Sequence, residues 1–444
     1  MASDKTAEAA LPRLQQPLFG PVVKTLLRPL MWPITRLFDQ IAAGQLRLTL
    51  GKRSYLLESE HEGPSAEIRI LRPVRMARRL ATKGHLGLGE SWMAGDWDSP
   101  DPTAALHLLA VNEHRWRERQ RGGPLHRLLS PLRHQRRSNT RTGSRRNIAY
   151  HYDLGNDFYQ LWLDPSMTYS SAVFDADALG NDAQPDETAG DDEQGLNPAL
   201  SPVLSPALNR AQQRKYQHLL GMLNAEAGQR LLEIGCGWGA MAEVAVAEGL
   251  RLTGITLSEE QLAWAKARFE GSPRADQVEL RLQDYRDVTE TFDHIVSIEM
   301  FEAVGEDYWP IYMQTLHDRL KPGGTAALQV ITIADAIFED YKASPDFIQH
   351  YIFPGGMLPT VDRFDAAAHD AGLEVVERRF YGKDYARTLS AWHRRFLAHE
   401  EAVRALGYDE RFIRMWRYYL SYCEAGFLDD RIDVMQVALR HRRG

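Results

Sequence analysis

The feature that most constrains the fold is a glycine-rich turn between a buried strand and a helix. Residues 230–234 read Arg-Leu-Leu-Glu-Ile, as a buried strand does, and Gly-Cys-Gly-Trp-Gly at 235–239 leads into a helical stretch at 240–248. Glycine lets the backbone turn tightly and approach a ligand closely. The spacing is G-x-G-x-G rather than the dinucleotide G-x-G-x-x-G, and Trp238 would crowd a pyrophosphate. The turn therefore favours a site of the S-adenosylmethionine (SAM) type over a nicotinamide site.

Strands and helices alternate along the rest of this region. Further strand candidates lie at 252–256, 278–282, 294–298 and 326–331, and helical stretches lie at 259–269 and 309–320. Such alternation predicts a parallel sheet with helices on both faces. We therefore expect an α/β fold of the Rossmann-like class I SAM methyltransferase type.

Upstream of this region, leucines and isoleucines alternate with polar residues at 46–50 and 68–70, as in half-buried strands. We expect a small α+β domain at 35–114, preceded by an N-terminal arm at 1–34. The apolar segment 18–41 is interrupted by charges and prolines. It predicts neither a membrane span nor a signal peptide. A surface-lying amphipathic segment and an arm packed on its own domain both stay open.

Two segments have extreme charge. Residues 115–146 hold eleven arginines and one acidic residue, interleaved with apolar residues. We expect this linker to contact an anionic phospholipid membrane surface, although a solvated flexible linker is the alternative. Nucleic acid would also attract it, but no base-reading motif accompanies it, so no specific nucleic acid is expected. Residues 175–206 are acidic and poor in apolar residues, which predicts a disordered insertion.

The number of cysteines indicates the redox state of the cellular compartment in which the protein works. The two cysteines, Cys236 and Cys423, argue against a disulfide framework and a cysteine-ligated zinc site. We read the compartment as reducing, hence cytoplasmic, with the protein peripheral to the inner face of the membrane.

Polar residues follow the second and third predicted strands of the α/β region. Gln283 and Asp284 would lie near an adenine edge, although Asp284 could instead cap a helix. Thr256 and Gln261 lie where a ribose or methionine moiety would bind, and Ser258 with Gln261 forms a capping box.

Seven motifs match a known family together: HYDLGNDFY at 151–159, MTYSS at 167–171, LEIGCGWG at 232–239, QDYRD at 283–287, MFEAVG at 300–305, YIFPGGMLP at 351–359 and DYARTLSAW at 384–392. With them the chain resembles the cyclopropane fatty acid synthase family, which includes the mycolic acid cyclopropane synthases. The resemblance runs from about residue 147 to the C-terminus apart from the acidic insertion. We therefore expect the methyltransferase domain at 147–444. The stretch GLGESW at 87–92 also looks like the N-terminal domain of bacterial members.

The resemblance implies a cofactor, a small anion and a substrate. The substrate would be a cis double bond in a phospholipid acyl chain, and relatives make a homodimer reasonable. Bicarbonate would be held partly by the residues matching Glu302, Ile331 and Tyr385. SAM would be bound by residues at eight positions: Tyr169, Ser170, Gly235, Gly237, Thr256, Gln261, Gln283 and Asp284.

The expected chemistry needs no side-chain nucleophile, because the sulfonium methyl is an electrophile and an alkene is a nucleophile. The site must align the partners, stabilise a carbocation and remove a proton. Aromatic faces such as Tyr169 and Tyr385 suit the cation, and a small anion, which Glu302 could orient through a shared proton, suits the proton. The structural alternative for Glu302 is a helix cap.

The sequence departs from the family near the site of proton removal. Ser171 stands where many members have Cys, Gln329 where they have His, and Ala303 where several have His. Ser and Gln still donate hydrogen bonds. We therefore predict that methyl transfer is retained, while a methyl-branched or methylene product could replace the ring.

Two other functions stay open. One is a SAM methyltransferase of a small soluble acceptor, which would not need the apolar residues between 338 and 358 that could line a lipid slot. The other is a lipid-binding protein that has lost catalysis.

Overall fold

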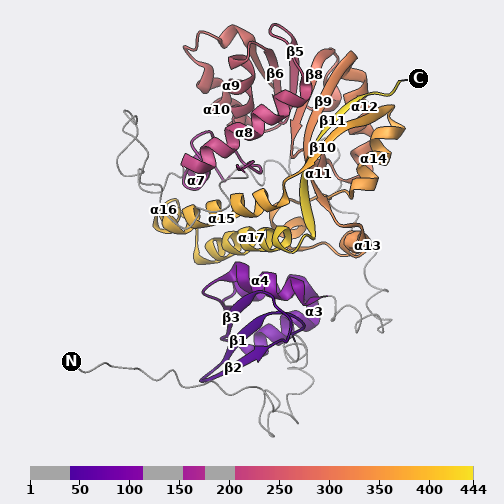
Figure 1. Ribbon diagram of the computed structural model, residues 1–444. Helices are drawn as coiled ribbons and strands as arrows, with labels where there is room; N and C mark the ends of the chain where they lie inside the picture. The colour runs from indigo at the N-terminus through magenta and orange to yellow at the C-terminus, as the bar shows by residue number, and fades with distance from the viewer. Residues whose placement is uncertain (1–40, 114–153, 176–205, 444) are drawn as a thin grey trace, which may run out of the picture. The chain divides into compact units, whose positions relative to one another are not determined.

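The structure is a computed structural model that describes residues 41–113, 154–175 and 206–443 (Figure 1). These residues form two compact units. The small unit holds the N-terminal part of the chain and residues 409–429, and the large unit holds the rest. None of the helices in the described ranges is both long enough and apolar enough to cross a membrane. The arginine-rich linker, the N-terminal arm and nearly all of the acidic insertion lie outside the described residues.

The small unit is built on a four-stranded sheet in the order β2-β1-β3-β4. Its inward residues follow the alternation in the sequence, since Leu46, Leu48, Ile68 and Ile70 are all buried. The elements are β1 (Gln45–Leu50), β2 (Arg53–Glu58), β3 (Ser65–Ile70), α3 (Pro73–Met93), β4 (Trp97–Asp98), α4 (Pro102–Val111) and α17 (Glu410–Leu428).

Helix α17 joins this small unit from the far end of the sequence. The Trp92 indole N–H donates to the Arg414 carbonyl at 2.8 Å, and Arg414 Nε donates back to the Trp92 carbonyl at 2.6 Å. The Arg414 guanidinium also lies 4.2 Å from the Trp92 ring centroid. The sequence places this helix in the methyltransferase domain, whereas the structure packs it against α3 and α4.

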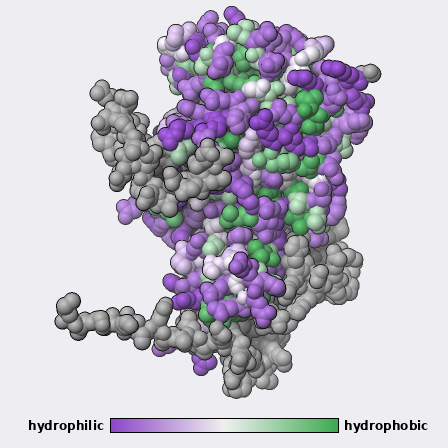
Figure 2. Space-filling view, viewed as in Figure 1, coloured by the Kyte–Doolittle hydropathy of each residue, from purple (hydrophilic) through white to green (hydrophobic). Residues whose placement is uncertain are grey.

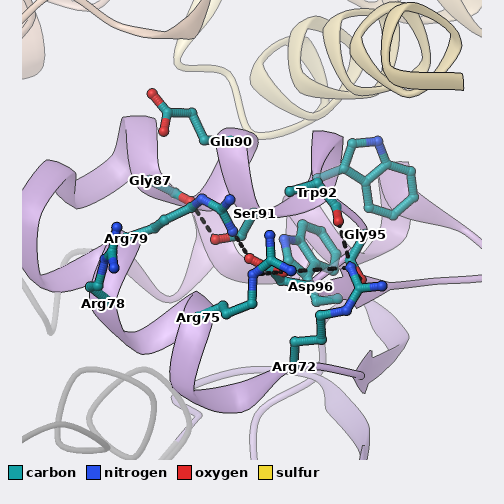
Figure 3. Close-up of polar contacts among 12 residues, drawn as sticks. Arg72, Arg75, Arg78, Arg79, Gly87, Glu90, Ser91, Trp92, Gly95 and Asp96 are labelled. Carbon is teal, nitrogen blue, oxygen red and sulfur yellow. Dashed lines mark hydrogen bonds and ion pairs between the residues drawn. The ribbon is translucent and has the colours of Figure 1, made fainter. Parts of the chain in front are cut away.

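A buried carboxylate fixes the turn between α3 and β4 (Figure 3). Asp96 is fully buried, and the guanidinium groups of Arg72, Arg75 and Arg79 surround it. Its amide donates to the Ser91 carbonyl at 2.8 Å. An isolated buried charge is strongly destabilising, so the three arginines offset the cost of burying this carboxylate.

The large unit contains a seven-stranded sheet in the order β10-β11-β9-β8-β5-β6-β7. Strands β5 to β9 are mutually parallel as predicted, whereas β10 and β11 extend the sheet in antiparallel fashion. The strands are β5 (Arg230–Ile234), β6 (Arg251–Thr256), β7 (Val278–Leu282), β8 (Phe292–Ile298), β9 (Leu320–Ile333), β10 (Leu373–Phe380) and β11 (Ile432–His441).

Helices cover both faces of this sheet (Figure 1). Leu231 contributes to an apolar core with α8, α9 and α10, while its neighbour Leu232 contributes to a second core with α12 and α14. The α-helices are α7 (Asn156–Gln160), α8 (Pro206–Leu223), α9 (Ala240–Ala247), α10 (Glu259–Phe269), α11 (Phe301–Val304), α12 (Trp309–Arg319), α13 (Asp335–Ala343), α14 (Val361–Asp370), α15 (Gly382–Ala398) and α16 (Glu400–Ala405). Short helices η4 (Ala275–Gln277), η5 (Tyr285–Asp287) and η6 (Glu306–Tyr308) and a π-helix, η7 (Ile348–Ile352), complete the unit.

The surface seen in Figure 2 is mainly hydrophilic, with hydrophobic residues interspersed among the polar ones. The predicted α/β architecture with a core on each face of the sheet is confirmed. In such a sheet, ligands bind at the carboxyl ends of the parallel strands, so the site is expected beyond the ends of β5, β6 and β8.

Candidate active site

The glycine loop lies at the carboxyl end of β5. Gly235, Gly237 and Gly239 all have positive φ, at 86°, 50° and 87°. A Cβ added to Gly235 would lie 2.3 Å from Met300 Cγ, so this glycine is needed for packing. A Cβ added to Gly237 would meet nothing within 4 Å. The loop is therefore closed on one side and open at Gly237, where a ligand can approach the backbone, and this geometry fits SAM.

The end of β6 brings together two of the predicted SAM-binding residues. The Thr256 hydroxyl donates to Gln261 Oε1 at 3.0 Å and accepts from the Ser258 amide at 3.2 Å. Ser258 Oγ accepts from the Gln261 amide, so the predicted cap of α10 is confirmed. The Gln261 side chain bonds Thr256 rather than completing a reciprocal capping box.

Beyond β7, Asp284 is held within the chain. Its carboxylate accepts from the Arg286 amide at 3.0 Å and from the Arg286 guanidinium at 2.8 and 2.6 Å. The Gln283 side-chain Nε2 donates to the Asp287 carbonyl at 3.0 Å. The structure thus shows the capping role of Asp284, at the start of η5. Adenine binding by this pair stays a prediction.

The segment 167–171 is shaped by a buried turn and enters an aromatic cluster. Asp164 accepts from the amides of Ser166 and Thr168 at 3.0 and 3.1 Å, and Met167 has a φ of 57°. The Tyr169 ring centroid lies 5.3 to 6.3 Å from four other aromatic rings, those of Tyr159, Trp162, Phe353 and Trp392. The π-faces collected here suit a positively charged ligand or intermediate.

Glu299, immediately after β8, is the centre of a hydrogen-bond network. Its Oε1 accepts from the Ser171 amide and from Gln329 Nε2, both at 2.8 Å. Its Oε2 accepts from the Tyr385 hydroxyl at 2.8 Å. Gln329 is oriented in turn by Gln436, whose Nε2 donates to Gln329 Oε1 at 2.9 Å. Three segments far apart in sequence therefore bind one carboxylate, and the Ser171 hydroxyl takes no part because it donates to the Ala172 carbonyl.

Glu302 lies three residues further on, in the first turn of α11. Its Oε1 accepts from the Ile331 amide, and its Oε2 is buried without a hydrogen-bond partner among the described residues. Burial and the neighbouring charge of Glu299 raise the pKa of Glu302 to about 8. A carboxyl with such a pKa is protonated at neutral pH, which leaves the negative charge of the pair on Glu299.

Lys215 on α8 supplies the buried positive charge of the site. It is fully buried, and its Nζ donates to Ser170 Oγ at 2.6 Å. Burial lowers the pKa of Lys215 to about 7, against the opposing attraction of Glu299, Asp164 and Glu233. The pKa of Glu233 is raised by burial to about 8. A single lysine thus faces three buried carboxyl groups, and burial raises the pKa of each of them.

The predicted catalytic residues come together in the structure. Ser171, Gln329 and Tyr385 all bind Glu299, while Ile331 binds Glu302. Sequence reasoning missed the residue that three of them share, and it missed Lys215 and Gln436 as well. The signal for Glu299 is a carboxylate directly after a buried strand, three residues before Glu302.

The apolar stretch proposed as a lipid slot is divided between core and site. Phe338, Phe347 and Ile352 are buried, and Phe338 belongs to the core around α12 and α14. Phe353 is less buried and lies 6.3 Å from the Tyr169 ring, centroid to centroid. Among the residues that the structure describes, no cluster of potential metal ligands is found.

Comparison with known proteins identifies the family. The model of the mycolic acid cyclopropane synthetase family matches residues 139–437. The chain is 38% identical over 374 residues to the tuberculostearic acid methyltransferase UfaA1 of Mycobacterium tuberculosis, covering 83% of this chain and 82% of that protein. It is 35% identical over 380 residues to the cyclopropane-fatty-acyl-phospholipid synthase of Escherichia coli, covering 84% and 87%.

A solved structure agrees with these relatives. The mycolic acid cyclopropane synthase CmaA1 complexed with SAH and CTAB superimposes with a TM-score of 0.57 at 28% identity, covering 66% of this chain and 97% of that one. The family match covers more than half of the chain and includes the glycine loop and the Glu299 network. The chain is a SAM-dependent methyltransferase that belongs to the mycolic acid cyclopropane synthetase family.

Proposed function

We propose that this enzyme transfers a methyl or methylene group from SAM to the cis double bond of an unsaturated phospholipid acyl chain. The observation that carries the proposal is the carboxyl pair Glu299 and Glu302 beside the aromatic cluster around Tyr169. Attack by an alkene leaves a carbocation that must lose a proton from carbon. A site for that reaction needs π-faces for the cation and a base for the proton, and both are present here.

The residues present can support this chemistry without a nucleophilic side chain. SAM would supply an activated methyl group, held by the open loop at Gly237 and the residues after β6. Cation–π attraction from the Tyr169 ring would be worth about 0.5–2 kcal/mol to the carbocation. The named activities of the M. tuberculosis and E. coli relatives support a fatty acyl acceptor.

The product is either a cyclopropane ring or a methylene-bearing chain. Both arise by loss of one proton after methyl transfer, and both add CH2 to the acyl chain. One relative is named a methyltransferase and another a cyclopropane synthase. Three residues depart from the family pattern and lie on or near the segments that hold the carboxyl pair: Ser171, Gln329 and Ala303. This chain would therefore differ from its relatives in how the carbocation loses its proton. A saturated methyl-branched chain would require a separate reduction of the methylene product.

The test is incubation of the enzyme with methyl-labelled SAM and vesicles of a cis-unsaturated phospholipid. We expect label in the acyl chains and a mass gain of one CH2. Mild hydrogenation then separates the products, since a methylene takes up hydrogen and a ring resists it. Vesicles of the saturated phospholipid are the control and should stay unlabelled. Absence of label from every unsaturated vesicle, together with methylation of a soluble amine, would move the assignment to a small acceptor.

Contact of the 115–146 linker with an anionic membrane surface stays part of the proposal, as do cytoplasmic location and a homodimer. Flotation of the protein with anionic and with zwitterionic vesicles tests the first of these. We expect binding to anionic vesicles that weakens with salt, because each arginine near such a surface contributes about 1 kcal/mol of attraction to anionic headgroups.

A further inference from the structure

The anion site that the family resemblance implies is already filled by the protein itself. Bicarbonate would be held partly by the positions of Glu302, Ile331 and Tyr385. In this chain the Tyr385 hydroxyl donates to Glu299 at 2.8 Å, and the Ile331 amide donates to Glu302. The Ser171 amide also donates to Glu299. Gln329 Nε2 donates one hydrogen to Glu299 at 2.8 Å and the other to the Ser171 carbonyl at 3.2 Å. The Ser171, Gln329, Ile331 and Tyr385 donors are therefore all occupied by the protein, which leaves only the Glu302 carboxyl to meet an added bicarbonate ion.

We infer that the carboxylate of Glu299 takes the place of bicarbonate and is the catalytic base of this enzyme. The inference rests on the proposed function, because it assumes an alkene acceptor. A carboxylate has the planar O–C–O geometry and single negative charge of bicarbonate. It is held here by three donors from three segments, as a bound anion would be.

The backbone shows that Glu299 is placed at some cost. Its φ is 52°, in the left-handed region, which L-residues other than glycine rarely adopt. The Glu299 amide donates to the Gln329 carbonyl at 2.7 Å, which holds this turn. Non-glycine residues persist in such conformations mainly where the surroundings fix them, and such residues cluster at active sites. The turn directs the carboxylate toward Ser171, Gln329 and Tyr385.

The charge distribution keeps Glu299 competent as a base. Burial raises the pKa of Glu299, while its three hydrogen bonds and the Lys215 ammonium oppose that rise. Glu302, whose pKa is raised to about 8, holds a proton at neutral pH and so leaves the ionised state to its neighbour. As whole residues, Glu299 is half-buried and Glu302 is buried.

The step balances without an outside reagent. The alkene π-electrons form a C–C bond to the methyl carbon as its S–C bond breaks, and a carbocation results. For the ring, a C–H bond of the transferred methyl group then breaks, its proton passes to the Glu299 carboxylate, and its electron pair closes the ring. For the methylene product, a 1,2-hydride shift first moves the positive charge to the methyl-bearing carbon, and the same loss of a methyl proton to Glu299 then forms the C=CH2 double bond. Glu299 returns to the ionised state by releasing the proton to water.

The first test measures bicarbonate binding directly and needs no turnover. The full-length protein is titrated with ¹³C-bicarbonate and followed by NMR, as wild type and as Glu299→Gly. Glycine relieves the left-handed strain and vacates the donors, so we expect saturable binding in the millimolar range for Glu299→Gly and none for wild type. Saturable binding to wild type would overturn the inference.

The second test measures turnover in CO2-free buffer. Wild-type activity should change less than twofold when bicarbonate is added. Glu299→Gln, which keeps shape but not charge, should lose about 10²- to 10⁴-fold, the usual contribution of a general base. Its SAM affinity by calorimetry and its melting temperature should stay near wild type. Glu299→Gly should regain at least tenfold on addition of bicarbonate.

The outcomes separate the two proposals. A Glu299→Gln enzyme within threefold of wild type, or a wild-type enzyme that requires bicarbonate, would refute the role of Glu299. If wild type labels no unsaturated vesicle, the proposed function fails, while the NMR comparison still decides whether Glu299 fills the anion site. If Glu299→Gly does not fold, the Glu299→Gln and wild-type measurements still decide the question.

Discussion

Replacing Tyr385 by phenylalanine isolates one hydrogen bond to the proposed base. The Tyr385 hydroxyl donates to Glu299 Oε2 at 2.8 Å, and its ring packs edge-on against Trp392 with centroids 6.2 Å apart. Tyr385→Phe keeps that ring and removes only the donor. A hydrogen bond to a charged group contributes about 1.5–3 kcal/mol, which corresponds to about one to two pKa units at 1.36 kcal/mol per unit.

The direction of the effect follows from which form the hydrogen bond stabilises. Tyr385 favours ionised Glu299, so its removal raises the pKa of Glu299. The other groups facing this carboxylate stay in place: Lys215, which favours the ionised form, and Glu302, which is protonated at neutral pH. A base acts when it is ionised, so the acid limb of the pH–rate profile should move to higher pH by about one to two units.

The acid limb of the pH–rate profile is measured by single-turnover assays at a series of pH values. Each assay follows the transfer of label from methyl-labelled SAM to unsaturated vesicles. Below the limb, Tyr385→Phe should be about 10- to 100-fold slower than wild type, and well above it the difference should shrink. Tyr381→Phe is the matched control, because the Tyr381 hydroxyl pairs with His218 Nδ1 at 3.2 Å instead of with Glu299. A uniform loss at all pH values, or an equal shift in Tyr381→Phe, would refute the reasoning.

Three further predictions test the supports of the site and of the small unit. Gly235→Ala should lower the melting temperature strongly, because the added Cβ would overlap Met300. Gly237→Ala should cost only about 1–2 kcal/mol of stability through backbone strain. The same Gly237→Ala change should weaken SAM binding at least tenfold, as measured by calorimetry. Arg414→Met should destabilise the small unit by about 2–4 kcal/mol in denaturant unfolding, through its lost hydrogen bonds to Trp92 and Trp97, with SAM affinity unchanged. Asp96→Ala should cost about 1.5–3 kcal/mol in the same assay, because the ion pair with Arg79 is lost while Arg72 and Arg75 are half-exposed and stay hydrated. A loss under about 1 kcal/mol would contradict that role.

The central sheet was predictable because its signals are local. Residues 230–234 carry Leu231, Leu232 and Ile234 directly before the glycine loop, and the strands at 251–256 and 292–298 are each followed by helical segments. Strands β10 and β11 were not predicted. They extend the sheet beyond β9 by antiparallel pairing. The β10–β11 pairing joins segments about 60 residues apart, and the β11–β9 pairing joins segments about 100 residues apart. The packing of α17 on the small unit was not predictable for the same reason, because Arg414 on this helix bonds Trp92, which lies 322 positions earlier in the chain.

Most residues of the candidate site were predicted from the sequence, but Glu299, which binds three of them, was not. Ser171, Gln329, Ile331 and Tyr385 were identified because the family resemblance carries each position over individually. Glu299 lies just outside the matching motif MFEAVG, and its backbone conformation is one that sequence patterns assign to glycine. The charge state of the pair was also inaccessible, because it depends on burial and on Lys215, which lies on a helix more than 80 residues earlier.

The spacing of the two carboxyl groups explains how one site can hold both and use them differently. The left-handed turn at Glu299 ends β8, so Glu302 enters the first turn of α11 with only the Ile331 amide to accept from. Glu299 receives three donors and faces Lys215, so the rise in pKa that burial causes is opposed more strongly at Glu299 than at Glu302. The proton of the pair therefore resides on Glu302 and the charge on Glu299. A chain with this arrangement carries its own anion beside the cofactor, and its reaction should not depend on dissolved carbon dioxide.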